Sequence, residues 1–190
     1  MDDPHEHLRA DRHLGPVVDR HGPVGLDVAD DPFERLLGSI LRQQLSMDAA
    51  AAIRERLFEA VDPTPAAIRA ADETVMREAG LSAAKVEYAK ALADAWTAND
   101  WSREHFADLP DEAVVEEVTA VRGIGPWSAK MFLMFGLGRT DVFPVEDLGI
   151  RKAMWELVDA DLSRAAMVQH AERWAPHRSY ASRYLWRAIE

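Results

Sequence analysis

Apolar residues recur at helical spacing along most of this chain, and glycine or proline interrupts the pattern at short intervals. In residues 31–44 (DPFERLLGSILRQQ), an aspartate precedes a proline, and apolar residues follow three and four positions apart. An acid before a proline is typical of a helix start, and this spacing puts the apolar side chains on one face. No segment of useful length alternates as a half-buried strand does. The sequence therefore predicts an all-α fold of about ten short helices joined by short turns.

Capping residues, prolines and glycines predict where these helices begin and end. Ser46 and Ser82 precede alanine-rich runs as caps, short helices are expected around 65–70 and 72–79, and Leu109-Pro110 precedes a helix that stops at the glycines of RGIG. Later helices are expected to restart at Pro126 and Pro144, and near Asp161 and His177.

The length of 190 residues allows two small helical lobes with a cleft between them. Residues 1–30 are interpreted as an irregular lead-in with one short helix, packed on the C-terminal lobe. Residues 31–190 form the main domain, divided into a helical lobe at 31–120 and a second part at 121–190 that holds a hairpin and the C-terminal helices.

Cysteine is absent, which excludes disulfides, thiolate nucleophiles, thiolate-bound zinc and iron–sulfur clusters. The seven histidines show no metal-ligand spacing. We therefore expect no metal and no cofactor. No stretch approaches the roughly 18 apolar residues that a membrane-spanning helix needs, and the N-terminal segment is unlike a secretory signal. The expected location is the cytoplasm.

The net charge of −11 argues at first against nucleic acid as a partner, because DNA affinity rests largely on Lys and Arg neutralising phosphates. The acidic residues are unevenly distributed, however. Residues 1–110 carry a net charge of −9, whereas in residues 120–155 five basic side chains face three acidic ones. The acidic charge therefore lies mostly outside the segment that holds the next motif.

Residues 121–126 (VRGIGP) lie between two helical patterns. Glycines permit positive φ and a close approach of the backbone to a partner, and Pro126 fixes the next helix start. Backbone amides at that start are able to bind a phosphate. The two glycines alone are also typical of an ordinary turn between helices, so this spacing by itself leaves both interpretations open.

The longer segment VRGIGPWSAKMFLMFGLGRTDVFPVEDLGIRK resembles the signature of helix-hairpin-helix DNA glycosylases, in which an aspartate begins the helix after the hairpin. Asp147 stands at that place. Residues 40–50 (ILRQQLSMDAA) and 80–88 (GLSAAKVEY) resemble two further family segments, and residues 174–186 match the W-x-P-x-R-S-x-A pattern of the alkyladenine-type branch. The resemblance covers about residues 30–190, and it implies the helix-hairpin-helix glycosylase fold in a compact form.

The resemblance also implies a chemistry. Bifunctional members carry a lysine nucleophile two residues after the second hairpin glycine, and this chain has Trp127 there, which implies a monofunctional hydrolase without AP-lyase activity. An acid at a helix start is most often a favourable dipole partner. In this family, Asp147 instead implies a carboxylate that stabilises an oxocarbenium-like sugar and orients water. Glu146 is the weaker candidate, and Arg151 is expected to pair with Asp147 or with a phosphate.

Aromatic faces hold a cationic, electron-poor base well. By resemblance, Trp127 and Trp186 flank the flipped base, and Met131 stands where relatives often have an aromatic residue. For the other tryptophans we favour packing in the core; they are Trp96, Trp101, Trp155 and Trp174.

A flipped base leaves a gap in the duplex, and the resemblance places Gln44 there as a wedge, with Leu81 as a second candidate. The alternatives are an exposed turn residue and a packed hydrophobic residue respectively. The remaining residues expected to contact DNA are Gly123, Ile124, Gly125, Lys130 and Arg151. A monovalent cation at the hairpin carbonyls is the single ion that the family suggests.

The sequence thus predicts a monomeric, monofunctional DNA glycosylase of base excision repair that acts in the cytoplasm, at the nucleoid. Its expected partner is double-stranded DNA with a damaged base, and its expected substrates are alkylated purines of the 3-methyladenine and 7-methylguanine type, which it converts to abasic sites. Three alternatives remain open: a glycosylase for oxidised or deaminated bases, a non-catalytic DNA-binding module with the same hairpin, and an all-α interaction protein.

Overall fold

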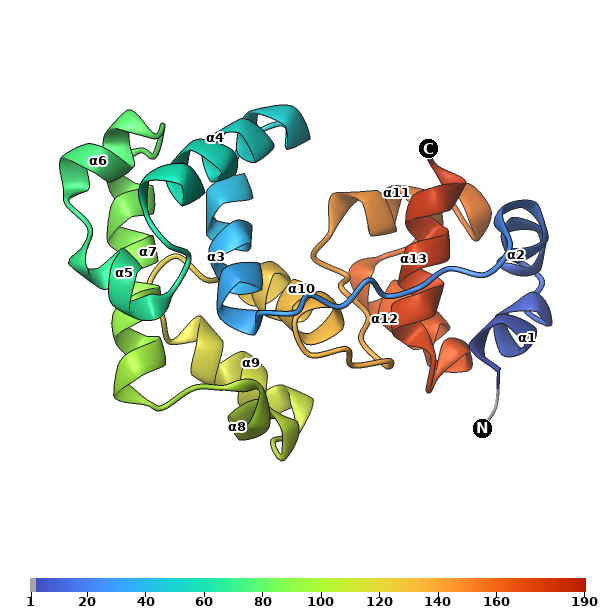
Figure 1. The fold of residues 1–190 in the computed structure, drawn as a ribbon. Coiled ribbons are helices and arrows are strands. Elements are labelled where there is room, and N and C mark those ends of the chain that lie inside the picture. Colours follow the sequence, from blue (N-terminus) through green and yellow to red (C-terminus); the bar gives the residue numbers. More distant parts are fainter. Residues whose placement is uncertain (1–2) are drawn as a thin grey trace. The chain divides into compact units, whose positions relative to one another are not determined.

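The computed structural model describes residues 3–190, and within this range the chain forms helices and loops without a strand (Figure 1). The helices make two compact units, one of residues 29–137 and the other of residues up to 28 together with 138–190. The prediction of an all-α fold is confirmed. None of the helices in the described range is long and apolar enough to cross a bilayer.

The unit of residues 29–137 contains eight of the described helices: α3 (Pro32–Arg42), α4 (Met47–Ala60), α5 (Pro65–Ala70), α6 (Glu73–Glu78), α7 (Ala83–Ala98), α8 (Arg103–Ala107), α9 (Asp111–Thr119) and α10 (Pro126–Phe135). Helix α3 is the centre of this unit, because it packs against α4, α7 and α10 (Figure 1). Its apolar face at Phe33, Leu36, Leu37, Ile40 and Leu41 is at most 2% exposed.

Side-chain caps fix the starts of the helices in this unit. Asp31 accepts from the Glu34 amide at 3.0 Å, Ser46 from the Ala49 amide at 3.3 Å, and Ser82 from the Lys85 amide at 3.3 Å. Each cap satisfies one of the amides that a helix start leaves without a partner, and contributes about 1 kcal/mol. The predicted starts of α3, α4 and α7 are confirmed.

An aromatic cluster fills the core of this unit. The Trp96 ring lies 5.3 Å from Phe33, 5.8 Å from Trp101 and 5.9 Å from Phe106, centre to centre. Trp96 and Trp101 are 8% and 6% exposed, as predicted for core residues. Large rings of this kind contribute much of the buried apolar area of a small domain.

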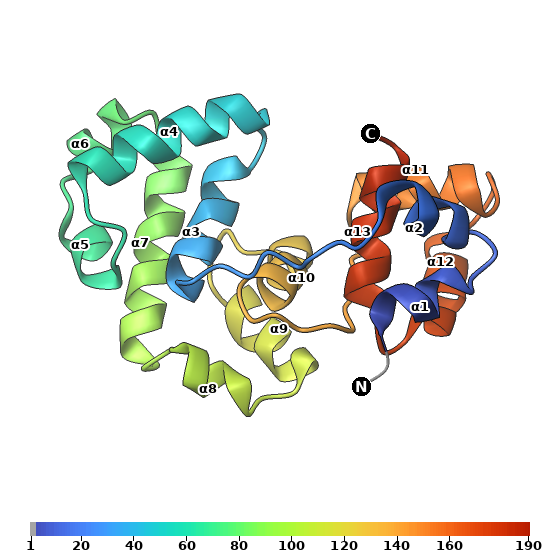
Figure 2. The ribbon, with the colours of Figure 1, turned by 45° about the vertical axis from the view of Figure 1, so that its right-hand side comes forward.

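The other unit contains α1 (Pro4–Arg9), α2 (Gly15–His21), α11 (Leu148–Leu157), α12 (Arg164–Ala171), a short 3₁₀ turn η1 (Glu172–Trp174) and α13 (Arg178–Ala188). Figure 2 shows α1 and α2 in dark blue beside α13 in red. Leu8, Leu14 and Val18 of the N-terminal segment are buried in one core with Ile150, Trp174 and Leu185.

Three expectations about this unit were wrong. Residues 3–28 hold two helices and not the one expected, because Asp3 caps the first, Asp11 accepts from the amides of His13 and Leu14 just before the second, and the core buries their apolar faces. Helix α11 begins at Leu148 rather than at Pro144, since Asp147 caps it. Trp155 is 36% exposed, and its indole N–H donates to the Leu162 carbonyl at 3.0 Å.

The boundary between the units also differs from the expected one. The hairpin at 121–126 and helix α10 belong with residues 29–137, whereas the sequence had placed the division at residue 120. The reason is packing, because α10 lies against α3 and α9.

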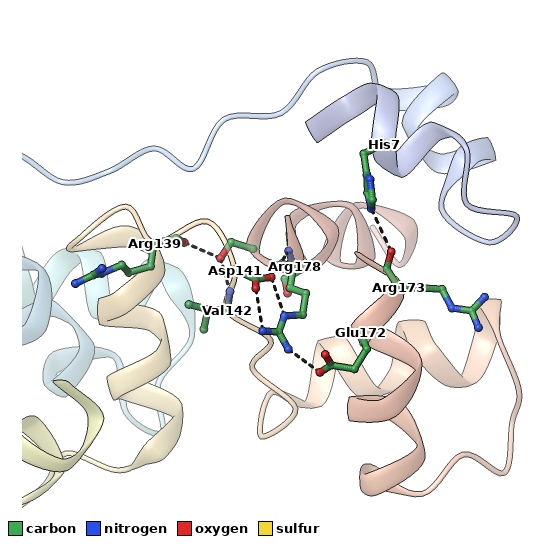
Figure 3. Close-up of polar contacts among 9 residues, drawn as sticks. His7, Arg139, Asp141, Val142, Glu172, Arg173 and Arg178 are labelled. Atoms are coloured by element: carbon green, nitrogen blue, oxygen red, sulfur yellow. Dashed lines mark hydrogen bonds and ion pairs between the residues drawn. The ribbon is translucent and has the colours of Figure 1, made fainter. Parts of the chain in front are cut away.

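Arg178 (Figure 3) and Ser179 anchor the loop that leads to α11. The Arg178 guanidinium donates to both carboxylate oxygens of Asp141, at 2.7 and 3.0 Å, and to Glu172 at 2.8 Å. The Ser179 hydroxyl donates to the Arg139 carbonyl at 2.7 Å and accepts from the Val142 amide at 3.0 Å. The W-x-P-x-R-S-x-A motif therefore fixes the path of the chain before Asp147.

Arg178→Ala is expected to lower the free energy of unfolding by about 2 kcal/mol, because it leaves the half-buried Asp141 without its bidentate donor. Urea denaturation followed by circular dichroism measures this change. The control is Arg187→Ala on the same helix, whose exposed pair with Glu190 should contribute less than about 0.5 kcal/mol. Equal effects of the two substitutions would contradict an anchoring role.

Candidate active site

Asp147 stands in the loop before α11 and caps that helix. Its Oδ1 accepts from the Ile150 amide at 3.0 Å, and its backbone is extended, with φ −70° and ψ 128°. The residue is half-buried. The cap lies at the positive end of the helix dipole, where a negative charge interacts favourably with the helix. The structure thus places the predicted acid where a negative charge is stabilised.

Trp186 of α13 donates its indole N–H to the same Oδ1 of Asp147, at 2.9 Å. This contact depends on Gly149. A Cβ at that position would lie 3.0 Å from Asp147 Oδ1 and 3.0 Å from Trp186 Cδ1. Two donors from separate helices therefore hold one carboxylate oxygen, and a glycine leaves the space for them.

Arg151 follows Asp147 by one turn but contacts backbone instead. Its guanidinium donates to the Val145 carbonyl at 3.1 Å and to the Glu146 carbonyl at 2.6 Å. The expected pairing of Arg151 with the Asp147 carboxylate is absent among the described contacts. Arg151 instead holds the turn that presents Asp147.

The hairpin lies in the other unit, between α9 and α10. Gly123 has φ +93°, which an L side chain rarely adopts, and a Cβ there would overlap the ring of Tyr88. Ile124 is buried at 5% exposure, so it anchors the loop from inside. Gly125 is exposed, is the N-cap of α10, and has open space where a Cβ would point. The hairpin therefore offers an accessible backbone at a helix start, which is suited to an oxyanion.

The turn between α3 and α4 is tied to this hairpin. The Gln43 side-chain amide donates to the Gly123 carbonyl at 2.7 Å, and the next residue, Gln44, is exposed with φ +58°. Lys85 of α7 holds the end of α3, with Nζ donating to the Leu41 carbonyl at 2.7 Å, and burial lowers the pKa of this lysine. The predicted wedge residue thus stands on a turn that is fixed to the predicted phosphate-binding loop.

The remaining candidates are distributed over both units. Trp127 and Met131 lie one turn apart on α10, Trp127 half-buried and Met131 4% exposed, and Lys130 between them is half-buried. The structure does not bring these residues and Trp186 into one unit. Leu81 is 3% exposed, so the wedge role expected for it is withdrawn, because a buried side chain does not reach a duplex.

Within residues 3–190, no group of three or more His, Asp or Glu side chains is placed to hold a metal ion. The functional groups are then a rigid carboxylate with an indole donor in one unit, and an accessible hairpin backbone with a linked glutamine turn in the other. The carboxylate is suited to stabilising a positive charge, and the hairpin backbone is suited to binding a phosphate.

Comparison with known proteins identifies the family of the chain. Residues 37–177 match the family described as HhH-GPD superfamily base excision DNA repair protein. DNA-3-methyladenine glycosylase 1 of Schizosaccharomyces pombe is 35% identical over 184 residues, which cover 93% of this chain and 80% of that protein.

Two solved structures have the same fold. A DNA-3-methyladenine glycosidase of Bacillus halodurans superposes with a TM-score of 0.87 at 31% identity, covering 98% of this chain and 89% of the other. A 3-methyladenine DNA glycosylase of S. pombe, in complex with abasic DNA, superposes with a TM-score of 0.86 at 32% identity, covering 96% and 94%. The chain belongs to the HhH-GPD superfamily of base excision DNA repair proteins.

Sequence reasoning missed two residues of this site, Gln43 and Gly149, and the donor role of Trp186. The hydrogen-bond partners of Gln43 and Trp186 lie 80 and 39 residues away in the chain, so no local sequence pattern predicts these contacts. The glycine directly after Asp147-Leu148 is the one available signal, since a glycine in the first turn of a helix otherwise costs stability.

Gly149→Ala should fail to give the helix stabilisation that the change normally brings, about 0.5–1 kcal/mol, because the new methyl group pushes Trp186 away from Asp147. Gly38→Ala in α3 is the matched control, since its Cβ would meet nothing within 4 Å, and it should show the full gain. Chemical denaturation measures both free energies, and proton NMR measures exchange of the Trp186 indole N–H. An unchanged exchange rate in the Gly149 variant, with the same stabilisation as the control, would contradict the contact.

Proposed function

We propose that this protein is a monofunctional DNA glycosylase that hydrolyses the N-glycosidic bond of alkylated purines in duplex DNA. It acts as a monomer and leaves an abasic site. The observation that carries this proposal is the Asp147 carboxylate, held at a helix start by the Ile150 amide and the Trp186 indole. The names of the relatives, which are 3-methyladenine glycosylases, support the substrate class.

The chemistry follows from charge. When the base–sugar bond breaks, the deoxyribose becomes oxocarbenium-like, and an ionised carboxylate beside it lowers the energy of that state. Asp147 also accepts the proton of the attacking water as the new bond forms at C1′. The two donors on Oδ1 hold the carboxylate in one orientation, so that little reorganisation is needed during the reaction.

The leaving group decides which further residues are needed. A 3- or 7-alkylated purine is already cationic, so it departs without a strong general acid, and an aromatic face attracts it. Trp127 and Met131 on α10 and Trp186 on α13 are the side chains we propose for this recognition. Oxidised or deaminated bases are uncharged before the bond breaks, so they would leave as anions unless they are protonated or stabilised by specific hydrogen bonds, which makes them the second choice.

In this proposal, backbone amides of the hairpin and a few side chains hold the DNA. The amides at the Gly123–Gly125 turn bind a phosphate, with Lys130 and Arg151 as further basic contacts, and Gln44 fills the gap that the flipped base leaves. A monovalent cation at the hairpin carbonyls is compatible with this arrangement. The net charge of −11 makes such defined contacts necessary, because the protein as a whole repels DNA.

Asp147→Asn should lower base release from methylated duplex DNA by at least about 100-fold while leaving DNA affinity unchanged. Asparagine keeps an oxygen acceptor for the Ile150 amide and the Trp186 indole, so the cap and the fold should persist. Release of methylated purines is measured by chromatography, and binding by fluorescence anisotropy.

Three other outcomes, one from the Asp147 variant and two from a panel of duplexes with the wild-type protein, decide between the alternatives. Undiminished release from the Asp147 variant would eliminate the mechanism. Wild-type protein that binds DNA and releases no base from any member of a panel of single-lesion duplexes would favour the non-catalytic DNA-binding module. Release of oxidised or deaminated bases ahead of methylated ones would favour the second substrate class.

No covalent enzyme–DNA complex should form when the reaction is run with sodium borohydride, because Trp127 provides no amine for a Schiff base. Denaturing gel electrophoresis detects such a complex, and a glycosylase with a known lysine nucleophile serves as the positive control. A trapped complex, or strand cleavage at the abasic product, would show that another amine of this chain acts as a lyase.

A further inference from the structure

A pocket of about 360 Å³ lies in the unit of residues 29–137, separate from the hairpin. It runs along the outer side of α3, and its charged lining includes Arg35 and Arg42 of α3 and Arg54 of α4. Of these three arginines, Arg54 is neutralised by an ion pair with Glu34. Within the described part of the chain, no ion pair joins Arg35 or Arg42 to an acid, so two like charges share this pocket.

Arg35 is the more constrained of the two. Its side chain is half-buried, and its guanidinium carbon lies 5.3 Å from the centre of the Phe135 ring. Burial lowers the pKa of Arg35 to about 10, and the neighbouring charge of Arg42 adds to the shift. The guanidinium therefore stays charged at neutral pH in a place where water stabilises it poorly, and an anion would relieve that cost.

Gly38 leaves the space between these arginines open. It lies three residues after Arg35 and four before Arg42, so all three share one face of α3. A Cβ at Gly38 would meet nothing within 4 Å. A ligand is thus able to approach the helix backbone between two guanidinium groups, which present several donors each in a planar fork.

The acids of the pocket restrict its ligand. Asp30 and Asp31 lie at the N-terminal end of α3, where Asp31 caps the helix. Arg42 lies near the other end of α3, seven residues after Arg35 and roughly 10 Å from it along the helix axis. These carboxylates repel a doubly charged anion more strongly than a singly charged one. The pocket therefore suits an oxyanion with one negative charge, such as a phosphodiester.

We infer that Arg35 and Arg42 bind a phosphodiester group of the DNA strand, as a second backbone anchor besides the hairpin. This inference rests on the proposed function for the identity of the ligand. Position supports it, because Arg42 directly precedes Gln43, whose side chain contacts the hairpin at Gly123. In a protein of net charge −11, two arginines on the helix tied to the hairpin, neither of them in an ion pair within the described residues, would add to the attraction for DNA.

A matched pair of substitutions tests the inference at Gly38. Gly38→Glu introduces a carboxylate between the two arginines, whereas Gly38→Gln adds a side chain of the same size without charge. Both should fold with undiminished Tm, because the position is open and glycine is a poor helix former. Gly38→Glu is expected to weaken binding to an abasic-site duplex about tenfold at roughly 0.1 M salt, and Gly38→Gln to stay near wild type.

The salt dependence of binding distinguishes a phosphate contact from a general charge effect. Arg42→Gln should make the slope of log K against log [KCl] shallower by about 1, the value for one lost phosphate contact. Arg69→Gln on α5 changes the net charge by the same amount but removes an exposed ion pair elsewhere in this unit, and should leave the slope unchanged. Equal slopes for the Arg42 and Arg69 variants, or equal affinities for the two Gly38 variants, would overturn the inference.

A titration with inorganic phosphate separates the two sources of an oxyanion. NMR signals of the Arg35 and Arg42 side-chain N–H groups should shift on addition of duplex DNA and respond weakly to millimolar phosphate. A saturable response to phosphate with none to DNA would assign the pocket to a free anion and overturn the DNA assignment. Base release at saturating enzyme should survive in Gly38→Glu, so loss of the second anchor and failure of the proposed chemistry give different results.

Discussion

One carboxylate oxygen, Oδ1 of Asp147, joins the helices that form the candidate active site. Asp147 Oδ1 accepts from the Ile150 amide at the start of α11 and from the Trp186 indole of α13. The contact is possible because Gly149 has no side chain, and it is maintained because Arg151 holds the preceding turn by its carbonyls. The helix cap, the indole donor and the turn form one rigid support for a single charge, and charge stabilisation of this kind depends on such preorganisation.

The motif around Arg178 extends that support outward. Arg178 binds Asp141 and Glu172, and Ser179 joins the Arg139 carbonyl to the Val142 amide, so the loop before Asp147 is fixed by side chains of α13. A pattern that resembles the signature of a glycosylase branch thus acts here as a structural clamp. In the other unit, Gln43 has the corresponding task, because it fixes the turn that carries Gln44 to the hairpin at Gly123.

Predictions from local rules and from burial had different outcomes. Caps at Asp31, Ser46 and Ser82 appeared where the sequence placed them, because capping needs only residues within three positions. Burial was less well predicted: Trp155 is partly exposed, and Leu81 is buried where an exposed wedge was expected. On a short helix, the sequence does not indicate which apolar side chains will pack against another helix. The two helices of residues 3–28 are stabilised by the core in which their apolar side chains are buried.

The sequence by itself determined the all-α fold, the capped starts of α3, α4 and α7, and the glycine hairpin. These follow from periodicity and from turn and cap chemistry, which act over a few residues. The tertiary structure alone decided that Trp186 donates to Asp147 and that Gln43 donates to Gly123. It also decided that Arg35 and Arg42 line one pocket, where neither forms an ion pair with an acid of the described residues. Such contacts join residues far apart in the chain or depend on what packs around them, and packing is a property of the whole fold.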